Sequence, residues 1–251
     1  MSAYDFAAQR LFVEDDLAEG ARVTPPAAAQ NYLLNVLRLR QGDAILLFNG
    51  RDGEWRASLD IVSKRAVALC VETRSREQTA PGDVHYAFAP LKQARLDYMV
   101  QKATEMGAGR LTPVLTRRAQ LRRVSAHRLR ANAIEAAEQC GLLTIPETME
   151  LIELDRYLAG LDPGRLLIFC DEDAPLTGAL ETLRGKGAES SSRAAVAVLI
   201  GPEGGFDETE RAMILWRENV LRLSLGPRIL RADTAAVAAL ALVQATLGDW
   251  R

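Results

Sequence analysis

Short apolar runs and alternating segments dominate the first part of the chain. Residues 44–48 are all apolar, and after a glycine-rich turn residues 54–61 alternate between polar and apolar positions and are followed by a further apolar strand pattern at 66–71. Alternation with a period of two is typical of strands that bury one face. With a further short strand at 11–13 and a helix at 27–39, the pattern predicts a compact β-rich barrel.

Strand and helix patterns alternate in the rest of the chain. The predicted strands are residues 84–89, 110–115, 166–170, 195–200 and 220–225. The predicted helices are residues 95–106, 125–140 and 235–247, with another that begins at Asp207. This alternation favours a parallel sheet with crossover helices, and uninterrupted apolar strands are typical of a sheet that is covered on both faces. The sequence therefore predicts an α/β domain after the β-rich one.

A polar stretch separates the two patterns. Residues 73–83 contain a Pro-Gly pair and show no periodicity, which is typical of a linker. A chain of 251 residues has the length of one large domain or two smaller ones. We therefore expect a β-barrel domain over residues 1–74 and an α/β domain over residues 75–251.

The most distinctive local pattern is a glycine-rich loop between a strand and a helix. Gly201-Pro-Glu-Gly-Gly-Phe206 follows the apolar strand, and Asp207 and Glu210 have the spacing of a helix capping box. Glycines let a ligand approach the backbone, and open α/β sheets bind ligands at the carboxyl ends of their strands. The pattern matches neither the dinucleotide fingerprint nor the P-loop. The alternative interpretation is a tight turn without a ligand.

A second strand, loop and helix follow. The loop runs from Gly226 to Arg231, and Asp233 or Thr234 is expected to cap the helix. Because residues 235–247 include no charged residue, we expect this helix to be buried nearly all round and to need a partner surface, such as that of a homodimer. Arg231 and Asp233 are candidate functional residues. The alternative is an ion pair within the loop together with a helix cap.

Charge is unevenly distributed along the chain. With 31 Lys and Arg and 33 Asp and Glu the net charge is −2, yet residues 92–130 hold ten basic and two acidic residues. That segment carries +8, so the rest of the chain carries −10. Such segregation indicates contact with nucleic acid, and the alternative is a solvated charged face. The candidate RNA contacts are Arg10, Arg38, Lys92, Lys102, Arg117, Arg118, Arg122 and Arg123.

The residue counts argue against several classes of protein. The chain has 48% hydrophobic and 25% charged residues, which is typical of a globular protein. Its three cysteines form no Cys-x-x-Cys pair and its two histidines are far apart, so we expect no metal site and no thiol catalysis. Residues 1–10 lack the pattern of a secretory signal, and the longest apolar stretch, residues 235–243, is shorter than the roughly 20 residues that span a bilayer. We therefore expect a cytoplasmic protein with no membrane segment.

Four motifs in a fixed order resemble those of a known family. They are Lys-Ala-Thr-Glu-Met-Gly at 102–107, Ala-Ala-Glu-Gln-Cys-Gly at 136–141, Ile-Gly-Pro-Glu-Gly-Gly-Phe at 200–206 and Leu-Gly-Pro-Arg-Ile-Leu-Arg-Ala-Asp-Thr-Ala at 225–235. The set closely resembles the ribosomal RNA small subunit methyltransferase E family, whose members use S-adenosylmethionine to methylate N3 of a uridine in 16S rRNA. The resemblance implies a PUA-like barrel followed by a SPOUT domain, which is a trefoil-knotted parallel sheet with flanking helices that forms a homodimer. The implied partner is the 16S rRNA of the 30S subunit.

The resemblance assigns the cofactor to three loops that are distant in sequence. The implied cofactor-binding residues are Cys170, Asp171, Ile200, Gly201, Glu203, Gly204, Gly205, Ser224, Leu225, Gly226, Ile229 and Leu230. No metal is implied. We hypothesise that Arg231 stabilises the deprotonated uridine and that Asp233 orients it or accepts its proton, with Glu203 as the competing carboxylate.

Two features of the sequence depart from the family pattern. Asp233 stands where members generally have glutamate, and Leu142, Leu143 and Thr144 stand where members commonly carry an arginine. The rival function is that of a noncatalytic RNA-binding factor in ribosome assembly that keeps the fold without the transfer.

Overall fold

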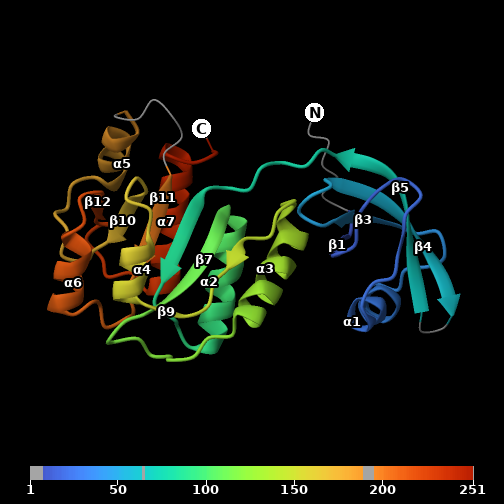
Figure 1. Cartoon of the computed structure of the whole chain (residues 1–251), viewed down its shortest axis with the longest axis horizontal. Coiled ribbons are helices and arrows are strands. Elements are labelled where there is room, and N and C mark those ends of the chain that lie inside the picture. The colour runs from blue at the N-terminus through green and yellow to red at the C-terminus, as the bar shows by residue number, and fades with distance from the viewer. Residues whose placement is uncertain (1–7, 64–65, 189–194, 251) are drawn as a thin grey trace. The chain divides into compact units, whose positions relative to one another are not determined.

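The structure is a computed structural model and describes residues 8–63, 66–188 and 195–250. The chain divides into two compact units (Figure 1). The N-terminal unit comprises Met1–Ala80 and Ala137–Ile145, and the C-terminal unit comprises Pro81–Ala136 and Pro146–Arg251. A short segment from the middle of the chain therefore belongs to the N-terminal unit. No helix within the described ranges combines the length and apolar character needed to cross a bilayer.

The N-terminal unit is built on a five-stranded mixed sheet. Its elements are β1 (Arg10–Phe12), β2 (Arg22–Val23), α1 (Ala27–Asn31), the π-helical segment η1 (Tyr32–Val36), β3 (Ala44–Phe48), β4 (Glu54–Ser63) and β5 (Ala66–Arg76). The strand order is β1-β3-β4-β5-β2, with β1 parallel to β3 and the other neighbours antiparallel. Leu59, which the alternation places on the inner face, and Leu69, its partner across the β4–β5 pair, are fully buried. The expected small β-rich fold is confirmed.

The helix predicted over residues 27–39 is shorter than the sequence suggests. It ends at Val36, because Arg38 adopts a left-handed conformation with φ +55°. The N–H of Leu39 then donates to the carbonyl oxygen of Leu33 at 3.0 Å, as in the Schellman motif that commonly ends helices. Glycine usually occupies this left-handed position, so an arginine gives no sequence signal for the helix end.

The C-terminal unit is a seven-stranded parallel sheet with helices. Its strands are β6 (Val84–Phe88), β7 (Ala108–Leu115), β8 (Glu147–Thr148), β9 (Ile152–Glu153), β10 (Leu166–Cys170), β11 (Val196–Ile200) and β12 (Val220–Leu223). Its helices are α2 (Gln93–Glu105), α4 (Leu154–Gly160), α5 (Ala179–Ala188), α6 (Glu208–Leu215), α7 (Ala232–Thr246) and α3 (Ala126–Cys140), of which the residues from Ala137 onward belong to the N-terminal unit. The strand order is β12-β10-β11-β6-β7-β8, and β9 also pairs with β7.

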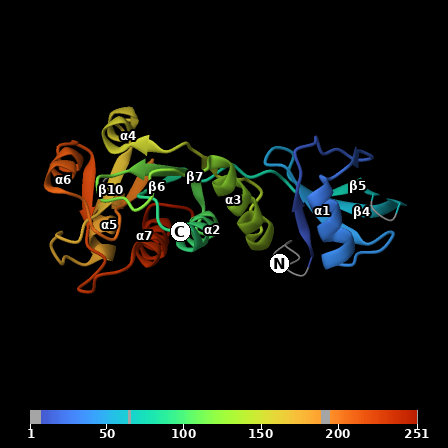
Figure 2. The same ribbon diagram turned by 90° about the horizontal axis from the view of Figure 1, so that it is seen from below.

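Helices cover both faces of this parallel sheet, with α4 and α6 on one face and α2, α5 and α7 on the other (Figure 2). Leu167 and Phe169 of β10 pack in one cluster with Leu158 of α4 and Ile214 of α6. Because successive side chains of a strand point to opposite faces, the buried Ile168 between them faces the other layer. This double burial explains the uninterrupted apolar strands, and the expected α/β class with a parallel sheet and flanking helices is confirmed.

The starts of two helices test the predicted caps. The capping box of Asp207 and Glu210 is present, and the Glu210 N–H donates to the Asp207 carboxylate at 2.8 Å. The prediction that Asp233 or Thr234 caps α7 is wrong, because the extended residue before this helix is Arg231 and its side chain makes no capping hydrogen bond. Asp233 therefore lies inside the first turn of the helix.

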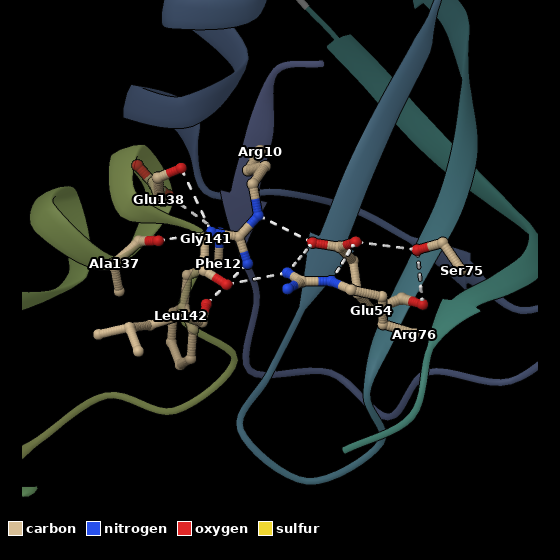
Figure 3. A network of polar contacts seen from close by, with 9 residues as sticks. All are labelled: Arg10, Phe12, Glu54, Ser75, Arg76, Ala137, Glu138, Gly141 and Leu142. Atoms are coloured by element: carbon tan, nitrogen blue, oxygen red, sulfur yellow. Dashed lines mark hydrogen bonds and ion pairs between the residues drawn. The ribbon is translucent and has the colours of Figure 1, made fainter. Parts of the chain in front are cut away.

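A buried ionic network holds the end of α3 in the N-terminal unit (Figure 3). The Glu54 carboxylate accepts hydrogen bonds from Arg10 Nε at 2.9 Å and from Arg76 Nη2 at 2.6 Å. Arg10 also donates to the Leu142 carbonyl oxygen at 2.7 Å, and Arg76 donates to that of Gly141 at 2.9 Å. Burial acts to raise the pKa of Glu54, but the hydrogen bonds from both arginines outweigh it and lower the pKa. One ionised carboxylate thus orients two guanidinium groups toward the end of a helix.

β6 carries a histidine that the protein interior keeps neutral. Burial, followed by the positive charges of Arg165 and Arg110, lowers the pKa of His85 from 6.5 to about 4. Between these two values the unfolded chain binds a proton that the folded chain does not bind. The free energy of unfolding therefore falls as the pH falls from 6.5 toward 4.

Between pH 7 and pH 4, protonation of His85 in the unfolded chain lowers the free energy of unfolding by about 3 kcal/mol. We expect His85→Gln to lose this contribution, so that its stability falls less steeply than that of the wild type. Urea unfolding followed by circular dichroism at several pH values between 7 and 4 measures it. The matched control is His127→Gln, which replaces a histidine at an exposed position on α3 and keeps His85 and its contribution to the acid sensitivity. Parallel stability curves for His85→Gln and the wild type would contradict the assignment.

Candidate functional site

A cavity of about 440 Å³ opens at the carboxyl edge of the C-terminal sheet. β10, β11 and β12 are neighbours that all end there, so the loops after them meet although they are distant in sequence. These are the first loop (residues 171–178), the glycine loop (residues 201–206) and the third loop (residues 224–231). The expected residues found on the wall are Cys170, Asp171, Ile200, Gly201, Glu203, Gly205, Ser224, Leu225, Gly226, Ile229 and Leu230.

Close packing fixes the glycine loop. Its last residue, Phe206, packs edge to face on Phe169 of β10, with 5.3 Å between the ring centroids. A Cβ atom on Gly201 would lie 2.6 Å from the Phe206 ring, which is too close without a shift of the ring. Gly205 adopts φ +66°, a conformation that residues with a side chain rarely adopt. Steric constraints therefore favour glycine at both of these positions on the cavity wall.

Gly204 belongs to the same loop but is not a wall residue. Its carbonyl oxygen accepts a hydrogen bond from Arg118 Nη1 at 2.7 Å, and a Cβ atom on Gly204 would lie 3.5 Å from the stem of the Arg118 side chain. The peptide thus turns toward the basic segment. The expected contact between Gly204 and a ligand is therefore not supported by the position of this residue on the outer side of the loop.

The buried Asp171 organises the first loop. Its carboxylate accepts hydrogen bonds from Arg211 Nη2 and Arg222 Nε, both at 2.7 Å. Burial acts to raise the pKa of Asp171, but the hydrogen bonds from these arginines and from the Asp173 N–H lower it overall. Burial raises the pKa of the neighbouring Cys170 thiol to about 12, so this thiol stays protonated at neutral pH and does not serve as a nucleophile.

Arg211 is a charged wall residue that lies outside the predicted cofactor loops. The acidic run at 171–173 directly follows a buried strand, and this position was a usable signal because a buried carboxylate requires a partner. The identity of that partner depends on tertiary structure, since Arg211 lies 40 residues further along the chain. Periodicity does not identify pairs of this kind.

The candidate catalytic residues occupy different places around the cavity. Arg231 is exposed and lies on the wall immediately before α7. Glu203 is also a wall residue, and its Oε1 lies 3.3 Å from Nη1 of Arg95. Asp233 is not a wall residue, and its Oδ1 accepts a hydrogen bond from the Thr234 N–H at 2.9 Å. No ion pair joins Arg231 and Asp233 in the described structure, so the alternative of a loop ion pair is not observed.

Many cations of the segment 92–130 are paired with carboxylates. The pairs are Arg95 with Glu203, Lys102 with Glu105, Arg110 with Glu147, Arg117 with Asp207, and Arg128 with Asp97. Four expected RNA contacts are exposed and form no ion pair with the residues that the structure describes, namely Lys92, Arg118, Arg122 and Arg123. The uncompensated charge is therefore smaller than +8 and is concentrated near 118–123.

The N-terminal unit holds two expected RNA contacts, which the structure distinguishes. The Arg10 side chain is 1% exposed, and its guanidinium is engaged by Glu54 and by backbone carbonyl oxygens. The expected RNA contact of Arg10 is corrected, because this guanidinium has no surface to offer. Arg38 is exposed at the left-handed position after η1.

Two family models match the sequence. One is described as an RNA methyltransferase domain and matches residues 78–244. The other is described as an RNA methyltransferase PUA domain and matches residues 26–69. The first match includes all three cavity loops, and the second lies within the N-terminal unit.

Known proteins are similar over nearly the whole chain. Ribosomal RNA small subunit methyltransferase E of Rickettsia conorii is 30% identical over 236 residues, which cover 94% of each chain. The protein of that name from Synechocystis sp. is 31% identical over 245 residues, which cover 96% of this chain and 78% of the relative.

Two solved structures share the fold throughout. Ribosomal RNA small subunit methyltransferase E of Neisseria gonorrhoeae, bound to S-adenosyl methionine, superposes with a TM-score of 0.82 at 27% identity and covers 97% of this chain and 100% of its own. A Legionella pneumophila protein in complex with bound SAM superposes with a TM-score of 0.83 at 29% identity and covers 96% of this chain and 99% of its own.

Proposed function

The chain belongs to the ribosomal RNA small subunit methyltransferase E family, and we propose that it transfers the methyl group of S-adenosylmethionine to N3 of a specific uridine in 16S rRNA. The observation that carries this proposal is the cavity at the ends of β10, β11 and β12, which is lined by the family motifs at 200–206 and 225–235. The relatives from N. gonorrhoeae and L. pneumophila, whose structures hold this cofactor, support it.

The cavity suits a cofactor of this size and charge. Its volume of about 440 Å³ falls within the range of about 300–1,000 Å³ that is usual for small-molecule sites. Gly201 and Gly205 leave the backbone accessible on one wall, and Glu172 and Glu203 add carboxylates that favour a cation. When bound, S-adenosylmethionine supplies an activated methyl group on a positively charged sulfur.

The residues of the chain would prepare the uridine for this step. N3 of uracil lies between two carbonyl groups and loses its proton before it attacks. Arg231 would donate hydrogen bonds to a uracil carbonyl and stabilise the resulting negative charge. Glu203 and Asp233 are the two candidates to accept the N3 proton. Glu203 lines the cavity, whereas Asp233 does not line it but follows Arg231 closely in the chain. The pH dependence of transfer by Glu203→Gln and Asp233→Asn distinguishes them.

The substrate RNA has to present an accessible base. N3 lies on the Watson-Crick edge, so the target uridine is unpaired or drawn out of its stack before transfer. The exposed cations Lys92, Arg118, Arg122 and Arg123 of the C-terminal unit would hold neighbouring phosphates, and the exposed Arg38 of the PUA unit would bind a phosphate as well. These backbone contacts position the RNA without selecting its sequence.

The proposal includes the homodimer and the trefoil knot that the resemblance implies. We further propose that the dimer acts on the 30S subunit in the cytoplasm. Apolar side chains at the surface of the C-terminal unit support self-association, since Ile229 is 92% exposed and α7 carries no charged residue after Asp233. Light scattering of the purified protein should give twice the mass of one chain, and the mass of a single chain would contradict the dimer.

Gly201→Ala should weaken binding of S-adenosylmethionine about tenfold, whereas Gly204→Ala should leave it nearly unchanged. The added methyl group meets the Phe206 ring at 2.6 Å in the first variant and only touches the stem of Arg118 at 3.5 Å in the second. Isothermal titration calorimetry measures both affinities. Equal losses of affinity in the two variants would contradict the assignment of Gly201 to the cavity side of the loop and of Gly204 to its outer side.

Methyl transfer to ribosomal subunits tests the proposed function. The protein is incubated with methyl-labelled S-adenosylmethionine and 30S subunits from a strain that lacks this methyltransferase. Label should enter 16S rRNA, and subunits that already carry the modification should take up none. Binding of the subunits without transfer would instead favour the rival function of a noncatalytic assembly factor.

A further inference from the structure

Two arginines of the basic segment hold the glycine loop from outside the cavity. Arg118 Nη1 donates to the Gly204 carbonyl oxygen at 2.7 Å, and Arg95 Nη1 lies 3.3 Å from Glu203 Oε1. Glu203 and Gly205, on either side of Gly204, are both wall residues. A movement of the Arg118 guanidinium therefore acts on the peptide between two residues that line the cavity.

The backbone beneath Arg118 is itself anchored. The N–H of Arg117 donates to Oε1 of the buried Glu210 at 2.7 Å, and Arg117 Nη1 pairs with Asp207 at 2.7 Å. Asp207 and Glu210 form the capping box of α6, which begins where the glycine loop ends. The Arg118 side chain thus extends from a fixed base to the outer side of the loop.

Arg118 also has donors that remain available to another ligand. A guanidinium carries five N–H groups in a planar fork, and phosphate oxygens match that fork. The side chain is exposed, and Gly204 is its hydrogen-bond partner among the residues that the structure describes. A phosphate can therefore bind the outer edge while Nη1 stays on the Gly204 carbonyl oxygen.

We propose that Arg118 is a positioning residue that couples the RNA backbone to the cofactor loop. A phosphate on its outer edge holds the guanidinium against Gly204 and so favours the loop conformation that binds the cofactor. Because coupling between two sites is reciprocal, RNA tightens cofactor binding and the cofactor tightens RNA binding to the same extent. This inference rests on the proposed function.

The test is a calorimetric titration with S-adenosylhomocysteine, the unreactive product, in the absence and presence of a saturating uridine-rich RNA oligonucleotide. In the wild type we expect RNA to tighten binding about fivefold. In Arg118→Ala, binding without RNA should weaken about fivefold through loss of the hydrogen bond, and RNA should no longer change the affinity. The matched control is Arg122→Ala, which should weaken RNA binding while S-adenosylhomocysteine binds as in the wild type.

A second variant, Arg118→Lys, distinguishes loss of the coupling from loss of positive charge and from loss of stability. An ammonium keeps the positive charge for RNA but lacks the planar fork, so this variant should retain most RNA affinity and lose the coupling. If Arg118→Ala has a lowered thermal unfolding midpoint, Arg118→Lys replaces it as the test variant. The inference is overturned if RNA leaves the affinity of the wild type for S-adenosylhomocysteine unchanged. It is also overturned if RNA tightens this binding as much in both Arg118 variants as in the wild type. Absence of S-adenosylhomocysteine binding by the wild type would instead contradict the proposed function.

Discussion

Arg231→Ala is expected to lower the turnover number of methyl transfer to 30S subunits by about 100- to 1,000-fold, the usual loss when one donor to a developing anion is removed. Arg231 is exposed on the cavity wall directly before α7. Deprotonated uracil carries its charge largely on the carbonyl oxygens, so a guanidinium beside them stabilises the transition state more than the neutral bound base. The dissociation constant of S-adenosylmethionine should therefore change little.

The control for this variant is Arg231→Lys. Lysine keeps the charge but cannot donate with a planar fork, so its turnover number should lie between those of the wild type and Arg231→Ala. A radiometric assay with saturating 30S subunits measures the turnover number, and calorimetry measures cofactor binding. Wild-type turnover in Arg231→Ala, with the cofactor still bound, would remove Arg231 from the proposed chemistry.

Glu54→Ala is expected to lower the free energy of unfolding of the N-terminal unit by about 3–5 kcal/mol, the usual effect of breaking a buried ion pair. The side chains of Glu54 and Arg10 are 2% and 1% exposed, so loss of the carboxylate leaves a buried guanidinium without its counter-charge. Arg76 loses the same partner. The neutral carbonyl oxygens that both arginines also contact offset only part of that cost.

Urea unfolding followed by hydrogen exchange of the β3 and β4 amides measures this loss in the N-terminal unit. The matched control is Asp16→Ala, which removes the carboxylate of a surface pair with Arg51 in the same unit. Asp16 is 96% exposed in that pair, so its loss should change stability little. Equal unfolding midpoints for Glu54→Ala and the wild type would show that the network contributes nothing to stability.

Much of the fold was predictable from the hydrophobic pattern, because strand burial determines that pattern. The strands predicted at 44–48 and 166–170 coincide with β3 and β10. The helix α4 was not predicted, because seven residues show too little of a helical period. The early end of the helix after α1 depends on the left-handed backbone of Arg38, which an arginine does not signal.

The loops of the site were predictable, but the directions of their groups were not. The motifs placed three loops together, and the family that they indicated is confirmed by the similarity to known members. Gly204 turns its carbonyl oxygen outward because Arg118 binds it there, and no sequence rule gives the orientation of a single peptide. Charge likewise does not separate an exposed arginine such as Arg122 from the buried Arg10, whose partner lies 44 residues away.

Nucleoside mass spectrometry of 16S rRNA tests the central claim most directly. The rRNA is taken from a strain without this gene and from the same strain supplied with the wild type or with Arg231→Ala. We expect N3-methyluridine to be absent from the deletion strain, restored by the wild type and not restored by the variant. If the expressed wild type restored no N3-methyluridine, or restored a different methylated nucleoside, the proposed reaction would be contradicted.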